Sequence, residues 1–362
     1  MKLSLTPTVI KIIFLVATSS ISLLGQETKI KFFGQPGFEY FYHPKLNTGA
    51  PYFRSGPLVL FVTSQLNEKF SVSGEFHAHY MAKTGAEAEI ERFYIKYDHS
   101  DYLSFRFGKM YTPIGHWNLN YNFGLILQPT ITRPFMLQPT HDGGFINTRD
   151  VGLQIEGNNI SKLRIYYKIF IFNGIGKNGG YLGVPYQLGE TPGISAQLGI
   201  EPTDGLRIST SAMYQMIQKG LPNQFDQIFN ENINTYLLSG SISFLNEEKK
   251  FELISEIFHN ANQYQSIGTK NFFGSFIYMG YKATDKVVPY LYSEYLKFNY
   301  SDPYFQDINV YTGQNYVNSL KSSLGLRYKY SNNVVVKFEG ETLNQDNYGF
   351  SFGVKTQVAF VF

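Results

Sequence analysis

The chain has no cysteine, so disulfide bonds, thiolate metal ligands and cysteine nucleophiles are excluded. Charged residues make up 16% of its 362 residues, well below the roughly 25% of an average soluble domain. Long hydrophobic runs are missing as well, because no segment after residue 25 approaches the ~20 consecutive apolar residues of a transmembrane helix. These absences exclude a disulfide-rich secreted domain and a helical membrane protein.

Aromatic residues and glycine are abundant instead. The chain contains 32 phenylalanines, 28 tyrosines and 33 glycines. Aromatic side chains suit strands and glycine suits turns, so we expect an all-β chain.

The net charge is too small to suggest a nucleic-acid partner. The formal charge of +3 falls to +1 once Lys2 and Lys11, which lie in a removable leader, are subtracted. Nucleic-acid binding requires a clustered basic face. We therefore expect no nucleic-acid partner.

Residues 1–25 predict a cleaved signal peptide. Lys2 and Lys11 supply its positive charge, residues 12–24 form a short apolar run, and Gly25 is a small residue at a plausible cleavage point. The apolar run is too short to span a bilayer. Residues 26–362 would then form the exported, mature domain.

The last twelve residues alternate in polarity. Even positions from Phe352 to Phe362 are apolar except Thr356, whereas the odd positions up to 357 are polar or glycine. Period-two alternation predicts a strand with one apolar and one polar face. A final strand that ends on phenylalanine resembles those of outer-membrane β-barrel proteins of Gram-negative bacteria. The resemblance implies a signal for the barrel-assembly machinery, formed by Phe352, Val358, Phe360 and Phe362.

Similar alternation recurs at 163–171, 206–215 and 323–330. In a soluble β-sandwich the apolar face of such a strand covers a core, whereas in a membrane barrel it meets lipid. Alternation alone does not distinguish these two folds.

Connection lengths favour the barrel. Short polar clusters predict turns at 67–69, 98–101, 158–161, 202–205, 246–249, 284–286 and 331–333. Mostly longer connections are predicted near 43–55, 81–87, 110–150, 175–191, 218–232, 260–270, 299–316 and 344–347. This sorting predicts a transmembrane antiparallel β-barrel of about 16 strands with both termini on the short-turn side. A sheet in lipid must close, and a barrel of this size leaves an aqueous bore.

The longest connection, 110–150, is an unusual loop. Its interior is apolar and must pack against something. Ladder strands are excluded by its four prolines, Pro113, Pro129, Pro134 and Pro139. As the third long connection, it is similar to the third extracellular loop of general porins, which folds inward and narrows the channel.

A motif precedes this loop. It reads Gly108-Lys109-Met110-Tyr111-Thr112-Pro113-Ile114-Gly115. The run resembles the Gly-Lys-x-x-Thr-Pro-x-Gly motif of porins from the Bacteroidetes and of the phosphate-selective porin O and P family. The alternative is that the motif only shapes the turn from strand to loop.

Basic residues gather on one arc of the predicted lumen. Side chains alternate between the two faces along each predicted strand, and this alternation assigns to the lumen face Arg92, Lys96, Arg106, Arg164, Lys168 and Arg207. The loop adds Arg133 and Arg149, opposed by Asp142 and Asp150, and Lys109 borders it. Lumen charges set ion selectivity, so we expect a weak preference for anions. The alternative is that these charges pair across neighbouring strands.

No catalytic or metal-binding constellation emerges. Outward-facing strand positions carry no set of serine and histidine, so we predict no enzyme. Glu75, His77 and His79 share one face of a strand, but no third histidine is placed nearby, so we predict no metal and no cofactor.

The sequence thus predicts an outer-membrane porin for passive diffusion of small hydrophilic solutes and ions. Its partners would be these solutes, outer-membrane lipid and the assembly machinery, and likeness to general porins implies a homotrimer. One alternative is a channel selective for an oligosaccharide or a phosphate-like solute, with Tyr166, Tyr290 and Tyr292 as candidates for an aromatic track. Another is a barrel that anchors adhesion or surface-complex assembly.

Overall fold

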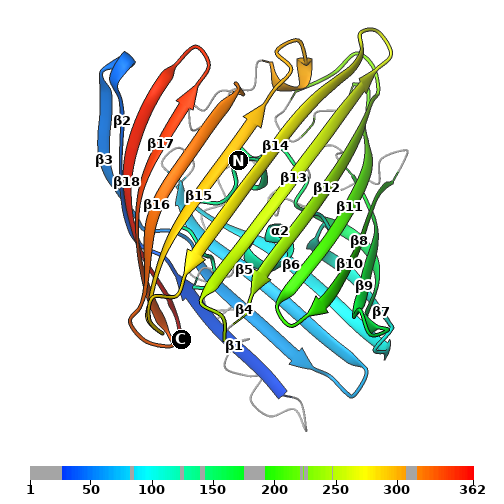
Figure 1. Ribbon diagram of the computed structural model, residues 1–362. Coiled ribbons are helices and arrows are strands. Elements are labelled where there is room, and N and C mark those ends of the chain that lie inside the picture. Colours follow the sequence, from blue (N-terminus) through cyan, green and yellow to red (C-terminus); the bar gives the residue numbers. More distant parts are fainter. Residues whose placement is uncertain are drawn as a thin grey trace.

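The computed structural model describes residues 27–81, 85–122, 126–138, 143–174, 192–220, 223, 227–246, 248–306 and 316–362. The predicted signal peptide lies outside these residues. Among them, no helix is long and apolar enough to cross a membrane. The strands form one sheet that curves round on itself (Figure 1).

The sheet contains eighteen strand segments. Their bounds are β1 (Glu27–Gly34), β2 (Gly37–His43), β3 (Thr48–Arg54), β4 (Leu58–Gln65), β5 (Phe70–Met81), β6 (Gly85–Ser100), β7 (Leu103–Tyr111), β8 (Arg149–Ile160), β9 (Ile165–Phe172), β10 (Gly193–Thr203), β11 (Leu206–Ile217), β12 (Ile233–Leu245), β13 (Phe251–Tyr264), β14 (Gly268–Tyr281), β15 (Val287–Lys297), β16 (Ser319–Lys329), β17 (Val334–Gln345) and β18 (Gly349–Val361). The helical segments are short, namely η1 (Pro44–Leu46), α2 (Trp117–Tyr121), η2 (Phe135–Leu137) and η4 (Pro303–Phe305).

Two pairs of segments are halves of single wall strands. β1 and β2 pair with β18 in one unbroken register, from Phe33 opposite Val361 to Tyr42 opposite Phe352. In the same way, β4 pairs with β1 and β3 pairs with β2. The break between β3 and β4 includes Gly56, which has a φ of 65°. The wall therefore has 16 strands, all antiparallel, and the pairing of the last with the first closes it. The predicted all-β fold, an antiparallel β-barrel of about 16 strands, is confirmed.

The connections follow the predicted alternation. Short turns at all seven predicted places join β4 to β5, β6 to β7, β8 to β9, β10 to β11, β12 to β13, β14 to β15 and β16 to β17. Three predicted long connections were wrong in extent. The connection predicted at 81–87 is shorter, because β5 continues to Met81 and β6 begins at Gly85. Strand β3 occupies most of 43–55, because its residues pair with β2. β13 and β14 continue to Tyr264 and Gly268, so the connection there is only 265–267.

The two faces of the wall differ in polarity. On β16 to β18 the exposed positions are apolar, such as Leu324 at 65% exposure and Val354 at 51%, whereas the alternate positions bury Lys337 and Glu339. A soluble barrel would bury its apolar face. An apolar exterior around a polar interior is the arrangement of a membrane barrel, which resolves the choice that alternation left open.

Candidate functional site

The motif Gly108 to Gly115 turns the chain from β7 into the segment 112–148, which replaces the predicted loop 110–150. Gly108 has a φ of 135°, and a β-carbon there would collide with the backbone of β6 at Phe93. Gly115 has a φ of 63°, and its β-carbon would collide with the carboxylate of Glu256. Both glycines are therefore required by backbone shape and close approach. The motif therefore makes the turn from β7 into the segment.

Three glutamates on β13, β15 and β17 hold the segment 112–148 through its backbone. Glu256 accepts a hydrogen bond from the backbone N–H of Trp117 (2.6 Å), and Glu294 accepts one from that of Phe135 (2.6 Å). Glu339 accepts one from the backbone N–H of Ile131 (3.2 Å). All three glutamates are buried. These hydrogen bonds fix the segment to the polar face of three alternate strands.

Aromatic packing reinforces these bonds. The ring of Phe145 lies edge-on to Phe272 at 4.7 Å, and Trp117 lies edge-on to Phe276 at 5.7 Å. The largest buried hydrophobic cluster of the described residues joins the segment to aromatic residues of β13 to β15, and it also includes apolar residues of β9, β11 and β12. That half of the barrel interior is consequently packed with side chains.

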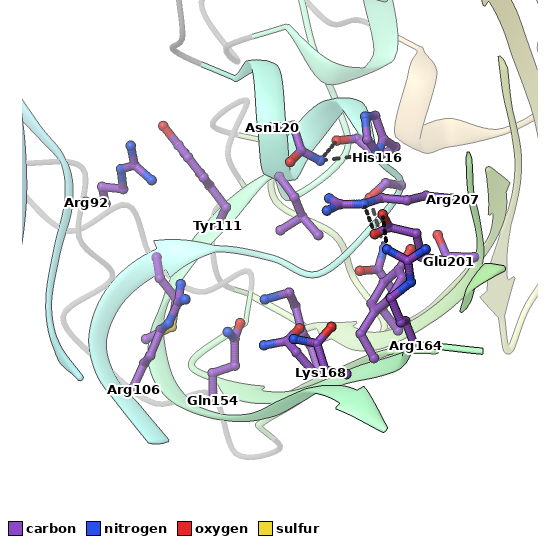
Figure 2. Close-up of a pocket in the computed structure, with 18 of the residues that line it drawn as sticks. Arg92, Arg106, Tyr111, His116, Asn120, Gln154, Arg164, Lys168, Glu201 and Arg207 are labelled. Atoms are coloured by element: carbon purple, nitrogen blue, oxygen red, sulfur yellow. Dashed lines mark hydrogen bonds and ion pairs between the residues drawn. The ribbon is translucent and has the colours of Figure 1, made fainter. Parts of the chain in front are cut away.

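A cavity of about 470 Å³ lies on the other half, between β6 to β11 and the start of the segment. Five basic side chains line it, namely Arg92, Arg106, Arg164, Lys168 and Arg207. Figure 2 shows them around the cavity, with His116 and Asn120 of the segment on another side. Among the described residues that line it, Glu201 is the one that is acidic. We call this cavity the basic pocket.

Ion pairs hold the basic side chains to the wall. Glu156 binds Arg106 at 2.7 Å and Lys168 at 2.6 Å, and Lys96 lies 3.8 Å from the same carboxylate. Arg92 donates its Nε to Glu75 at 2.5 Å. The predicted pairing across strands is therefore present, together with the basic arc.

Near the short turns, Glu201 accepts from Arg207 Nε at 2.9 Å and lies 3.5 Å from Arg164. Arg164 also pairs with Asp204 at 2.7 Å. Parity had placed Arg164 on a strand, but it lies in the turn before β9 with a φ of 49°. Its side chain still reaches the basic pocket.

In these ion pairs the basic side chain is more exposed to solvent than the acidic one. The side chain of Arg207 is 47% exposed against 18% for Glu201, and Arg106 is 24% exposed against 2% for Glu156. Asp204, in the turn itself, is an exposed exception. In the ion pairs that line the basic pocket, the positive side chain is therefore more exposed to solvent than its carboxylate partner.

The remaining predicted site residues lie elsewhere. Arg149 and Asp150 were assigned to the loop but begin β8, because they pair with Tyr111 and Met110 of β7. Arg149 bonds to Glu91 rather than lining the pocket. The loop residue Arg133 donates to Asn122 at 2.7 Å. The buried Lys109 donates to the carbonyl of Ile90 at 2.7 Å. Asp142 lies outside the described residues.

His116 is a pocket residue that sequence reasoning missed. Burial, with a smaller contribution from Arg207, lowers the pKa of His116 to about 3, so its imidazole is neutral at physiological pH. Its Nδ1 lies 3.2 Å from the hydroxyl of Ser243. No periodicity marks positions in an irregular segment, so only the three-dimensional contact could have identified it.

Comparisons with known proteins agree with this architecture. No protein-family model and no curated relative matches the sequence. Solved structures do match. An anion-selective porin from Comamonas acidovorans superposes with a TM-score of 0.66 at 10% identity, over 93% of this chain and 100% of that one. The outer-membrane channel DcaP of Acinetobacter baumannii gives 0.62 at 11% identity, over 94% and 99%. The trimer form of OmpT, an outer-membrane protein of Vibrio cholerae, gives 0.58 at 10% identity, over 92% and 99%. The chain has the fold of these outer-membrane porins and channels.

Proposed function

We propose that the protein is an outer-membrane porin through which small hydrophilic solutes and ions diffuse passively, with a weak preference for anions. The observation that carries this proposal is the greater exposure of the basic partner in the ion pairs of the basic pocket. Exposed charges attract counter-ions and set the selectivity of a pore. The fold of an anion-selective porin supports the same conclusion.

The segment 112–148 acts in this proposal as the inward-folded third extracellular loop. Its bonds to Glu256, Glu294 and Glu339 support that role, because these side chains belong to the polar face of the wall. Solutes then pass on the side of the basic pocket. Arg92, Arg106, Arg164, Lys168 and Arg207 are the proposed pore-lining residues.

The outer surface supports insertion into the outer membrane. Aromatic rings pair on it near the short turns, as Phe70 with Tyr97, and near the longer loops, as Phe273 with Tyr295. Aromatic girdles at both interfaces are typical of membrane barrels. Phe362 is the proposed contact for the assembly machinery. A homotrimer is the proposed assembly, and a protein of the same fold occurs as a trimer.

Two residues of the alternative aromatic track are buried. Tyr290 and Tyr292 lie in the hydrophobic cluster with the segment 112–148, and only Tyr166 of the three candidates lines the basic pocket. An oligosaccharide channel therefore has less support than a general porin.

The test is the single-channel conductance and reversal potential of the refolded mature protein in a planar bilayer. We expect ohmic steps and, under a potassium chloride gradient, a reversal potential displaced toward that of chloride. A folded barrel that conducts no current would contradict the proposal and favour an anchor for adhesion or surface-complex assembly.

A further inference from the structure

Three side chains on β5 and β6 form a cluster that the channel function does not use. One ligand atom each from His77, Glu89 and Glu91 lie within 4.8 Å of one another. His77 stands directly opposite Glu89 in the register of β5 and β6. We propose that these three residues bind a divalent transition-metal ion.

A β-bulge supplies the third ligand. The register shifts so that Glu75 pairs with Arg92 while Phe76 pairs with Ile90, which leaves Glu91 as the extra residue. Bulges commonly redirect a side chain. Here Glu91 and its neighbour Arg92 both reach partners on the polar face, namely Arg149 and Glu75.

Glu91 itself points to a missing ligand. Its side chain is completely buried, and its Oε1 accepts from Arg149 Nη1 at 2.8 Å. Its Oε2 has no hydrogen-bond partner among the described residues. A buried carboxylate oxygen without a partner is unfavourable, and a bound ion or water is the usual explanation. The metal ion would occupy that side of the carboxylate.

The imidazole has the support that metal-binding histidines normally have. The Nε2 of His77 lies 3.0 Å from Oε1 of Glu75, and the other oxygen of that carboxylate, Oε2, accepts from Arg92 Nε. Metal-ligating histidines almost always donate their second N–H to a carboxylate or carbonyl. Coordination through Nδ1 would leave the bond to Glu75 in place, so Glu75 is a positioning residue for this site.

The local charge also favours a cation. The carboxylates of Glu75, Glu89 and Glu91 face the guanidinium groups of Arg92 and Arg149. With a neutral imidazole, this group of side chains carries one net negative formal charge. Lys109 and Asp150, which have opposite formal charges, lie on the adjacent β7 and β8. A divalent ion would offset the excess.

The donor set selects the class of metal. One imidazole nitrogen and two carboxylate oxygens suit Zn²⁺, Mn²⁺ or Fe²⁺, with water in the remaining positions. Ca²⁺ would require six to eight oxygen ligands. Zn²⁺ is therefore the appropriate probe.

The experiment is calorimetric titration of Zn²⁺ into the untagged, refolded barrel in detergent. We expect one equivalent to bind to the wild type, and His77→Asn and Glu91→Gln to weaken binding at least ten-fold. Glu75→Gln should weaken it about ten-fold, as outer-shell substitutions do. His99→Asn, at an exposed histidine, is the matched control and should bind as the wild type.

X-ray absorption of the zinc-loaded wild type gives a second readout that needs no variant. We expect one imidazole nitrogen with oxygen donors in the zinc shell. The proposal is overturned if the wild type takes up no stoichiometric zinc, or if folded His77→Asn binds it unchanged. If Glu91→Gln does not fold, the proposal is tested by the X-ray absorption spectrum of the wild type and by zinc binding to His77→Asn. Binding is measured without a membrane, so its outcome is separate from that of the channel proposal.

Discussion

Gly115 lies so close to Glu256 that a β-carbon at position 115 would overlap the glutamate carboxylate. The same carboxylate accepts the backbone N–H of Trp117 two residues later. The approach of the segment 112–148 to the wall strand β13 therefore depends on the absence of a side chain at this position.

Substitution of Gly115 should loosen this contact. Gly115→Ala adds both a collision with Glu256 and an alanine at positive φ, which costs about 1–2 kcal/mol by itself. Gly220 also has a positive φ, of 74°, but nothing lies within 4 Å of its β-carbon position, so Gly220→Ala is the matched control. We expect a lower unfolding temperature for Gly115→Ala than for Gly220→Ala. Equal temperatures would show that the close contact with Glu256 contributes nothing.

Removal of Glu339 should release the middle of the segment. Its carboxylate accepts from Ile131 N at 3.2 Å, Thr132 Oγ1 at 3.2 Å and Tyr290 Oη at 2.8 Å. Glu339→Ala leaves each donor without this acceptor. A buried donor left without a partner lowers the stability of the folded protein by about 1–3 kcal/mol. We expect noisier single-channel current and faster proteolysis within 112–148. Glu231→Ala is the control, because Glu231 also accepts backbone N–H groups but from the connection between β13 and β14. A steady current in Glu339→Ala would contradict this role.

His116 should make stability depend on pH. Burial lowers its pKa to about 3 in the folded protein, whereas an unfolded chain has the ordinary value near 6.5. Below about pH 6.5 the unfolded state therefore binds a proton that the folded state does not, so this contribution to stability falls as the pH drops toward about 3. His116→Asn should reduce the loss of unfolding free energy between pH 7.5 and 4.5, measured with urea. His259→Asn, at an exposed histidine, is the control. An unchanged loss in His116→Asn would refute the prediction.

The terminal phenylalanine should matter for assembly more than for folding. Phe362 stacks on Phe32 of β1 at 5.3 Å and remains well exposed. Phe362→Ala should lower the amount of barrel in the outer membrane several-fold while the purified protein still refolds in detergent. Phe350→Ala, an exposed aromatic at the other end of β18, is the comparison. Equal amounts of both variants in the membrane would exclude a special role for the last residue.

Sequence patterns between near neighbours predicted the strands of the wall. The position of the segment 112–148 depends instead on contacts between residues far apart in the sequence, which such patterns do not contain. Turn clusters such as Asn246 to Lys249 and the alternation of β18 act between near neighbours, so they are readable in the sequence. Glu256 and Glu339, in contrast, bind backbone groups 139 and 208 residues away. Parity identifies them as polar-face carboxylates but cannot identify their partners. Arg149 was misplaced for a related reason, because pairing with β7 extends β8 into the predicted loop.

The most direct test of the anion preference is the reversal potential after loss of the pocket charge. Joint replacement of Arg106, Arg164 and Arg207 by serine removes three of the five basic side chains of the basic pocket. The same replacement of Lys219, Lys286 and Lys297, which are exposed and do not line the pocket, removes equal charge elsewhere. Under a potassium chloride gradient, we predict a shift toward the potassium potential for the pocket variant and none for the control. An unchanged reversal potential in a conducting pocket variant would contradict the account.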